Sequence, residues 1–197
     1  MNLPNKLTML RIFMIPLFIL CFYLPSDWVI GSYRGITMQW NYVIAAMIFL
    51  LAYVTDTLDG RLARARGLVT DFGKLMDPTA DKLLTSAALI MLCRFEVMSW
   101  GNSLMPIFTF VIIARELFVS GIRQLAASRG MVIAAKPIGK AKTTVQFIAL
   151  FVTMICGPFF KAIAVPLDFV LMSIAALLTI WSGIDYTLGA KELFSER

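Results

Sequence analysis

Six stretches of about 20 mostly apolar residues occupy more than half of this chain. They extend over residues 7–24, 38–58, 83–100, 104–125, 143–160 and 166–188. Each is long enough to cross a bilayer as a helix, and six stretches of this length leave no room for short strands. We therefore expect an all-α, polytopic membrane protein with six transmembrane helices that form a single domain over residues 1–197.

The low charge content supports a membrane protein, because 15% of the 197 residues are charged and 59% are hydrophobic. A soluble domain has about 25% charged residues, which help to cover its surface. No small-residue cleavage site precedes Pro25, so we expect the first stretch to be a retained helix rather than a signal peptide. Aromatic residues near the ends of the stretches resemble interfacial belts: Tyr23, Trp28, Trp40, Tyr42, Trp100 and Tyr186.

Lys and Arg are distributed unevenly among the segments that connect these stretches. The two termini and the second and fourth connections contain 14 of the 18, whereas the alternate connections contain only Arg34, Arg94 and Lys161. Because basic residues stay on the cytoplasmic side, we expect both termini and these two connections to face the cytoplasm. The net charge of +6 thus mainly indicates orientation, and no basic segment interleaved with aromatic residues points to a nucleic-acid partner.

The chain contains no histidine, which excludes histidine-based acid–base catalysis, the Ser-His-Asp triad and most catalytic zinc sites. Its three cysteines, Cys21, Cys93 and Cys156, lie far apart in apolar surroundings, and we expect them to be reduced. Any chemistry must therefore depend on carboxylates, amines, hydroxyls or metal ions.

Four aspartates are spaced for two facing helices at the cytoplasmic junction of the second and third stretches. Asp56 and Asp59 are three residues apart, so they lie on one face of a helix. The same holds for Asp77 and Asp81, which are four residues apart. Four converging carboxylates repel each other, so either some are protonated or cations bind them. Oxygen ligands suit Mg²⁺ or Mn²⁺, and two such ions commonly assist displacement at phosphorus. The nearby Asp71 is explained more simply as a solvated helix end.

Small residues and one arginine accompany the aspartates. Gly60 and Ala63 leave space for a phosphate or a nucleotide, and Arg64 can reach back to a phosphate. Gly73, on the second of the two helices, would admit a flat ligand. By themselves the glycines are equally compatible with close packing between membrane helices.

Together these positions resemble the signature of the CDP-alcohol phosphotransferases. The match comprises eight positions within 26 residues and has no departure: Asp56, Asp59, Gly60, Ala63, Arg64, Gly73, Asp77 and Asp81. The resemblance implies six membrane helices, a homodimer and two divalent cations, Mg²⁺ or Mn²⁺. It also implies that an alcohol displaces CMP from a CDP-linked substrate at the cytoplasmic face of the cell membrane.

The resemblance also assigns roles by position. Asp56, Asp59 and Asp77 would be metal ligands, and Asp81 would be a ligand or the catalytic base that activates the acceptor hydroxyl. A carboxylate base is also what remains in a chain without histidine. The CDP-binding residues implied in this way are Asn5, Gly60, Arg64, Thr70 and Gly73. Asn5 has an equally good alternative role as the N-cap of the first helix.

Basic residues outside the aspartate cluster bear on the identity of the acceptor. Arg115 and Glu116 lie inside the fourth stretch, where ionisable residues are costly and usually functional, although a structural ion pair is the alternative. A phosphorylated acceptor needs charge-assisted donors, and we assign six residues to its phosphate: Thr8, Arg11, Arg115, Arg123, Lys140 and Lys142. Residues 3–11, 115–123 and 139–144 resemble family members whose acceptor is sn-glycerol 3-phosphate.

The expected reaction converts CDP-diacylglycerol and sn-glycerol 3-phosphate into phosphatidylglycerophosphate and CMP, within membrane lipids. The same chemistry with inositol phosphate, phosphatidylglycerol or serine as the acceptor is the nearest alternative. Membrane prenyltransferases fit less well, because their aspartate spacing differs. A cation channel would not explain why Gly60, Arg64 and Gly73 are in phase with the acids.

Overall fold

The computed structural model describes the backbone of residues 3–25, 29–66, 71–131 and 137–190; within these ranges the side chains of residues 3–6, 33, 57–66, 71–75, 77 and 78 are left out. Six helices follow the six apolar stretches: α1 (Leu3–Cys21), α2 (Trp40–Arg66), α3 (Asp71–Phe95), α4 (Met105–Ser128), α5 (Pro137–Ile163) and α6 (Leu167–Gly189). The prediction of a predominantly helical protein is confirmed.

Three segments of the described chain are long and apolar enough to cross a bilayer. They are α5, α6 and Asn102–Ser128, in which a short 3₁₀ helix, η1 (Asn102–Leu104), leads into α4. The apolar parts of α1 and α2 are shorter, Leu7–Cys21 and Trp40–Asp56. These helices fit an integral membrane protein, and the count of six spans stays a prediction.

Helices α2 and α3 each have one polar end, which lowers the mean hydropathy of the whole helix. With 27 residues, α2 is about 40 Å long, whereas the hydrocarbon core of a bilayer is about 30 Å thick. Its last part, from Asp56 to Arg66, is rich in aspartate and arginine. The first part of α3, residues 71–82, contains five of the six charged residues of that helix. The adjoining ends of both helices are therefore polar extensions of an apolar body.

A short hairpin joins α1 to α2, so the expectation of a chain without strands is wrong at this point. Strands β1 (Val29–Tyr33) and β2 (Ile36–Gln39) are antiparallel, and Tyr33 pairs with Ile36. Only Arg34 and Gly35 remain in the turn, with φ angles of 51° and 77°. Positive φ at both central residues matches the twist of a two-residue hairpin turn. The hairpin lies in the connection between α1 and α2. The length of the apolar stretches predicts the helices but says nothing about the structure of a connection.

The third helix ends earlier than the apolar stretch that predicted it. We expected it to continue to Trp100, whereas α3 ends at Phe95 and Glu96 has a φ angle of 49°. A left-handed residue directly after a helix terminates it. The apolar residues that follow therefore pack as an irregular segment.

A buried carboxylate ties this irregular segment to α6. The backbone N–H of Ser99 donates to Oδ2 of Asp168 at 2.7 Å, and the Ser99 hydroxyl donates to Oδ1. Asp168 also accepts the backbone N–H of Phe169 at 2.9 Å. The same segment lies against α5, since a Cβ atom on Gly157 would be 2.5 Å from the Val97 carbonyl oxygen. Hydrogen bonds and close backbone packing thus join three elements at this end of the bundle.

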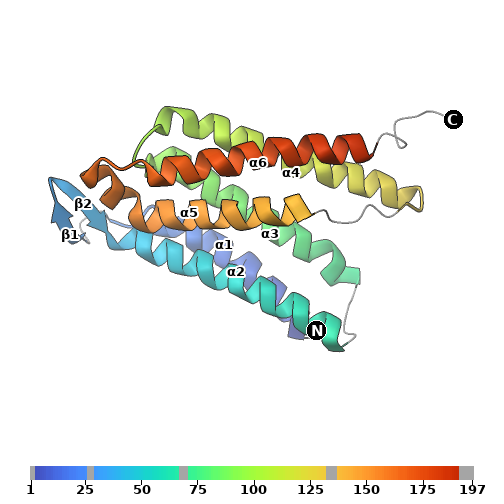
Figure 1. Cartoon of the computed structure of the whole chain (residues 1–197). Coiled ribbons are helices and arrows are strands. Elements are labelled where there is room, and N and C mark those ends of the chain that lie inside the picture. The colour runs from blue at the N-terminus through green and yellow to red at the C-terminus, as the bar shows by residue number, and fades with distance from the viewer. Residues whose placement is uncertain (1–2, 26–28, 67–70, 132–136, 191–197) are drawn as a thin grey trace.

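The six helices lie along roughly one common axis with alternating direction, and their connections lie at two opposite ends (Figure 1). The hairpin, the α3–α4 connection and the α5–α6 connection lie at one end. The start of α1, the end of α6 and the adjoining ends of α2 with α3 and of α4 with α5 lie at the other. This second end contains Asp56, Asp81 and the adjoining ends of α2 with α3 and of α4 with α5, so it is the end that we predicted to be cytoplasmic.

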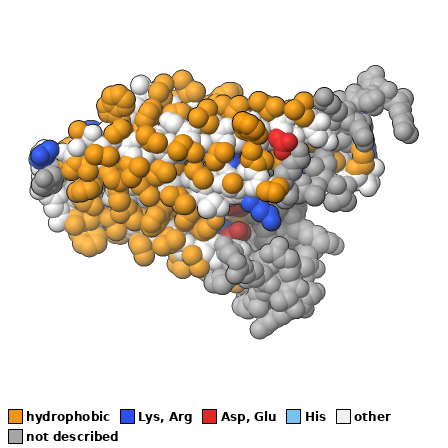
Figure 2. All heavy atoms as spheres, in the orientation of Figure 1, with side chains coloured by type: hydrophobic (Ala, Val, Ile, Leu, Met, Phe, Trp, Pro, Cys, Tyr) orange, Lys and Arg blue, Asp and Glu red, His pale blue; other side chains and the backbone are white. Residues whose placement is uncertain are grey.

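Hydrophobic side chains cover most of the visible surface; of the few charged side chains, some basic ones lie at the left end and the others lie near and to the right of the centre (Figure 2). Phe13, Phe110 and Trp181 are 70%, 71% and 67% exposed, respectively. Such an apolar exterior is unfavourable in water and suits lipid. Inside, α1, α2 and α3 pack through aromatic and small residues that allow close approach: Phe18, Phe49, Ala45, Ala46 and Ala88.

Candidate active site

A cavity of about 440 Å³ lies at the end of the bundle where α1 begins and α6 ends. Five helices contribute to its wall, which contains Tyr53, Asp81, Lys82, Arg115, Glu116, Val119, Ser120, Arg123, Gly139, Lys140, Thr143, Thr144 and Tyr186. Four of these residues are Lys or Arg and two are acidic, so the wall is positively charged on balance.

Of the two cluster aspartates whose side chains are described, Asp81 lines this cavity. Burial, and then the negative charges of Asp56 and Glu116, raise the pKa of the Asp81 carboxyl from 3.8 to about 6. The carboxylates of Asp56 and Asp81, on α2 and α3, are therefore close enough to repel each other, as their spacing predicted. A carboxylate with this pKa can accept a proton near neutral pH, and a cation beside it would relieve the repulsion.

The remaining members of the cluster are not described by their side chains. Asp59 lies in α2 and Asp77 lies in α3, but both side chains are outside the described residues. The same applies to the predicted CDP-binding residues Asn5, Gly60, Arg64, Thr70 and Gly73. Among the residues that the structure does describe, no group of three acidic residues or cysteines could hold a metal ion. The metal and nucleotide assignments stay predictions.

Arg11 of α1 lies against Asp56 rather than on the cavity wall. Its Nη1 atom is 2.7 Å from Oδ1 of Asp56, and the Arg11 side chain is 1% exposed. Thr8, one turn earlier on α1, is also buried. These two candidates for the acceptor phosphate thus lie on α1, which does not contribute to the wall of the cavity in the described part of the chain.

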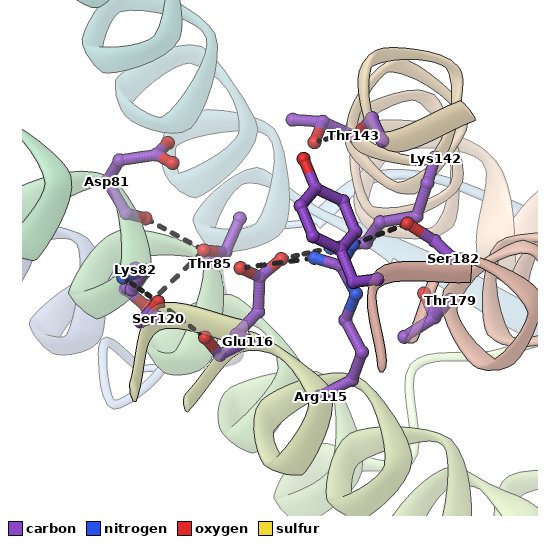
Figure 3. A network of polar contacts seen from close by, with 12 residues as sticks. Asp81, Lys82, Thr85, Arg115, Glu116, Ser120, Lys142, Thr143, Thr179 and Ser182 are labelled. Atoms are coloured by element: carbon purple, nitrogen blue, oxygen red, sulfur yellow. Dashed lines mark hydrogen bonds and ion pairs between the residues drawn. The ribbon is translucent and has the colours of Figure 1, made fainter. Parts of the chain in front are cut away.

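Lys142 of α5 forms an ion pair with Glu116 of α4 (Figure 3). The ammonium group donates to Oε1 of Glu116, and the Lys142 side chain is 1% exposed. Arg115 makes only a long contact with the same carboxylate, 4.0 Å from Nη1 to Oε2. The pairing compensates the charge of Lys142, which therefore adds less to the positive charge of the cavity than we predicted.

Helix α6 contributes the partners of the two arginines. Arg115 donates to the hydroxyl of Ser182, and Arg123 donates to the hydroxyl of Tyr186. Both guanidinium carbons lie over the Tyr186 ring, 5.5 Å and 5.0 Å from its centroid, which is within the range of cation–π attraction. Tyr186 is 1% exposed, so its assignment to an interfacial belt is wrong. Its ring lies inside the bundle because it packs against these arginines.

Several residues of the cavity wall were not assigned to the site from the sequence, among them Tyr53, Lys82 and Ser120. Lys82 donates to the Ser120 hydroxyl, which donates to the Glu116 carbonyl oxygen at 2.6 Å, so α3 and α4 are joined beside Asp81. The position of Lys82 next to Asp81 could have indicated its role, but it was counted only as a charge of the cytoplasmic connection. No pattern in the sequence distinguishes Tyr53 or Ser120 from core residues.

The arrangement suits an anionic substrate that carries a hydroxyl group. Helices α4 and α5 contribute Arg115, Arg123 and Lys140, and α3 contributes a carboxylate. A phosphate dianion requires several charge-assisted donors, which these cations can supply together. A hydroxyl of the same molecule could then meet Asp81 within the one cavity.

The comparisons with known proteins agree with this chemistry. The sequence model of the family described as CDP-alcohol phosphatidyltransferase matches residues 1–181. A Bacillus subtilis (strain 168) protein named CDP-diacylglycerol–glycerol-3-phosphate 3-phosphatidyltransferase is 38% identical over 186 residues, which cover 94% of this chain and 93% of that protein. A Pseudomonas fluorescens protein of the same name is 37% identical over 196 residues, covering 96% and 90%. A third, from Rickettsia bellii (strain RML369-C), is 36% identical over 194 residues, covering 98% and 97%.

Proposed function

The chain belongs to the CDP-alcohol phosphatidyltransferase family, and we propose that it transfers the phosphatidyl group of CDP-diacylglycerol to sn-glycerol 3-phosphate. The products are phosphatidylglycerophosphate and CMP, which places the enzyme in anionic phospholipid synthesis. The observation that carries this proposal is the cavity that combines Arg115, Arg123 and Lys140 with Asp81. The names of the relatives support the same pair of substrates.

The charge of the cavity favours a phosphorylated acceptor. A phosphomonoester dianion would be neutralised by Arg115, Arg123 and Lys140 through charge-assisted hydrogen bonds. Serine and phosphatidylglycerol have no phosphomonoester, so with either of them these cations would have no dianion to bind. Inositol phosphate would satisfy the same cations and is the nearest alternative acceptor.

Three other residues remain candidates for the acceptor phosphate. They are Thr8, Arg11 and Lys142. Arg11 lies against Asp56 and Lys142 lies against Glu116, so each would have to turn from a carboxylate to reach the substrate. Arg115, Arg123 and Lys140 need no such movement because they already line the cavity.

The proposed metal site consists of Asp56, Asp59, Asp77 and Asp81. The two aspartates whose side chains are described are compatible with a hard cation, because burial first and then the negative charge of Asp56 raise the pKa of Asp81, and a cation would offset both effects. When bound, two divalent cations, Mg²⁺ or Mn²⁺, would stabilise the charge that develops on the diphosphate. We propose that the CDP moiety is held by Asn5, Gly60, Arg64, Thr70 and Gly73.

The steps of the reaction can be assigned to residues of the chain. Arg115, Arg123 and Lys140 hold the phosphate of the acceptor and so direct its hydroxyl to Asp81. Asp81 takes the hydroxyl proton as the acceptor oxygen bonds to the lipid-linked phosphorus, and the bond from this phosphorus to the CMP oxygen breaks. A carboxyl pKa of about 6 suits a base that works near neutral pH.

The membrane arrangement is part of the proposal. We propose one domain over residues 1–197 with six spans in the cytoplasmic membrane, and with both termini and the cavity on the cytoplasmic side. The two-ended arrangement of the connections (Figure 1) supports this orientation, as does the sequence, in which the termini and the second and fourth connections contain 14 of the 18 basic residues. Membrane lipids would surround the exposed apolar residues. The proposed homodimer depends on the family resemblance alone.

A panel of acceptors tests the proposal. The full-length protein, purified in mixed micelles with CDP-diacylglycerol and Mg²⁺, is supplied with glycerol 3-phosphate, inositol phosphate, phosphatidylglycerol or serine, and CMP release is measured. We expect glycerol 3-phosphate alone to support turnover, chelation of divalent cations to stop it, and Mg²⁺ or Mn²⁺ to restore it. Turnover with another acceptor only would overturn the choice of acceptor, and turnover that persists without divalent cations would overturn the metal site.

A further inference from the structure

Tyr186 lies where α4, α5 and α6 meet, and the reaction steps above give it no role. Its ring is within 5.5 Å of the guanidinium carbons of both Arg115 and Arg123, and its hydroxyl accepts a hydrogen bond from Arg123. One turn earlier on the same helix, Ser182 accepts a hydrogen bond from Arg115. Helix α6 therefore contributes to the cavity mainly through contacts to the cations of α4.

The two neighbouring guanidinium groups of Arg115 and Arg123 need hydrogen-bond acceptors or an electron-rich ring beside them. Arg115 and Arg123 are close enough to repel each other electrostatically, and Arg115 is only 4.0 Å from one carboxylate, that of Glu116. Glu116 in turn is already paired with Lys142. The Tyr186 ring offers its negative face to both cations, and its hydroxyl oxygen gives Arg123 an acceptor. Both arginines are thus held in place before an anion binds.

The surroundings of Tyr186 leave the ring little freedom. A Cβ atom on Gly139 would be in ordinary van der Waals contact with Tyr186, 3.7 Å from Cε2, so the first turn of α5 lies beside the ring. A Cβ atom on Gly183 would lie 3.3 Å from Cγ of Arg115, so the stem of this arginine lies along α6. With Tyr186 1% exposed, its orientation is determined by packing on both sides.

We propose that Tyr186 is a positioning residue that sets the selectivity of the enzyme for a phosphorylated acceptor, by holding Arg115 and Arg123 in the geometry that a phosphate dianion requires. This inference rests on the proposed function, whose acceptor phosphate these two arginines bind. It assigns selectivity to a residue of the last helix, remote in sequence from the aspartate cluster. Tyr186 itself would touch neither the reacting hydroxyl nor the CDP-linked phosphorus.

Two substitutions separate positioning from packing. Tyr186→Phe keeps the ring and removes the acceptor of the Arg123 hydrogen bond, so the KM for glycerol 3-phosphate should rise about tenfold, as expected for one hydrogen bond to a charged group. Tyr186→Leu also removes the cation–π contacts and should raise this KM about 100-fold. In both variants kcat and the KM for CDP-diacylglycerol should change less than about twofold, because the lost interaction binds the remote phosphate in the ground state and the transition state alike.

Thr179→Val is the matched control. Thr179 is also fully buried on α6, and its hydroxyl donates to the Ala175 carbonyl oxygen of its own helix at 2.6 Å. Loss of this hydroxyl should leave the KM values for both substrates unchanged. An unchanged acceptor KM in Tyr186→Phe, or a fall in kcat of the two Tyr186 variants without a KM change, would show a purely structural role and overturn the inference.

Direct binding distinguishes failure of this inference from failure of the proposed function. Isothermal titration with inorganic phosphate and with glycerol 3-phosphate, in the absence of divalent cations, measures the phosphate subsite without turnover. We expect the wild type to bind both anions and Tyr186→Phe to bind both about tenfold more weakly. If this difference appears but glycerol 3-phosphate gives no CMP, the role of Tyr186 stands and the proposed acceptor is wrong. If the wild type and the variant bind phosphate equally, the inference is wrong whatever the acceptor.

Discussion

Lys142 and Glu116 form an ion pair between α5 and α4 in which the ammonium group is shielded from solvent and the carboxylate is partly open to the cavity. The side chains are 1% and 25% exposed, respectively. Glu116 therefore compensates a buried charge on one side and contributes a carboxylate to the cavity wall on the other. In this arrangement each charge compensates the other, and Lys142 would have to leave Glu116 to contact a substrate.

Loss of Glu116 should destabilise the protein. Glu116→Gln leaves the Lys142 ammonium buried without its counter-charge, and we expect the free energy of unfolding to fall by about 2 kcal/mol, less than for a fully buried pair because Glu116 is partly exposed. The double variant Glu116→Gln/Lys142→Met removes both charges and should regain most of this loss. Chemical unfolding in one detergent, followed by tryptophan fluorescence, measures both. Additive losses in the double variant would show that the two side chains are not coupled.

Asp81→Asn should abolish turnover and stabilise the metal-free protein. Because Asp81 is the proposed base or a metal ligand, we expect its replacement to lower the rate of CMP release by about 10²- to 10⁴-fold or more. Its pKa is raised from 3.8 to about 6 on folding, so ionisation of Asp81 at neutral pH costs the folded state on the order of 3 kcal/mol. Asparagine avoids this cost.

The pH dependence of the Tm tests whether ionised Asp81 destabilises the folded state. A carboxyl with a raised pKa favours the folded state below its unfolded pKa of 3.8, and this advantage is lost as pH rises through about 6. In a chelating buffer, Asp81→Asn should therefore have a higher Tm than the wild type at pH 7.5, and the difference should shrink as the pH is lowered to 5. A lower Tm for the variant at pH 7.5 would contradict this account.

Gly157→Ala should destabilise the bundle without changing substrate binding. The added Cβ atom would lie 2.5 Å from the Val97 carbonyl oxygen, so backbone must move, and we expect a loss of about 1–3 kcal/mol. Gly121→Ala on α4 is the matched control, because nothing lies within 4 Å of its added Cβ atom. Its stability should stay equal or rise by up to about 1 kcal/mol. Equal Tm values for the two variants would disprove the close contact between α5 and Val97.

Cysteine labelling tests the orientation. In a chain whose three cysteines are replaced by alanine, Arg34→Cys in the hairpin and Arg129→Cys after α4 introduce single thiols at exposed positions. A membrane-impermeant maleimide should label position 34 in intact cells and position 129 only after permeabilisation. Labelling of both positions in intact cells, or the reverse pattern, would refute the proposed topology.

The features that the sequence predicts correctly are local: the length of an apolar stretch and the spacing of residues within one helix. Apolar stretches of bilayer length predicted all six helices. The spacings within the pairs Asp56/Asp59 and Asp77/Asp81 predicted that carboxylates of two adjoining helices meet, and the electrostatic effect of Asp56 on Asp81 agrees with this for these two residues. Both are local properties of a helix combined with short connections. The hairpin escaped prediction because its turn depends on two residues, Arg34 and Gly35, within a segment too short for either pattern.

The partners of the basic residues could not be predicted in the same way. Charge alone placed Arg115, Arg123 and Lys142 at one anion, whereas the structure turns Lys142 to Glu116. Tyr186 resembled an interfacial aromatic residue because its position near the end of a span is the only property that the sequence shows. Which face of α6 meets α4 depends on the packing of helices that are distant along the chain, including the approach that Gly183 permits.

The polar extension of α2 beyond its apolar part, noted above for its length, has a kinetic consequence. At its proposed position beside the membrane surface, the site would receive glycerol 3-phosphate from the aqueous solution and CDP-diacylglycerol from the lipid bilayer. The effective concentration of the lipid is then its mole fraction in the membrane, which stays constant when the whole suspension is diluted. Adding inert lipid lowers the encounter rate while the bulk amounts of enzyme and nucleotide-linked lipid are unchanged. Flux through such an enzyme follows the composition of the membrane surface as much as the supply of the soluble phosphate ester.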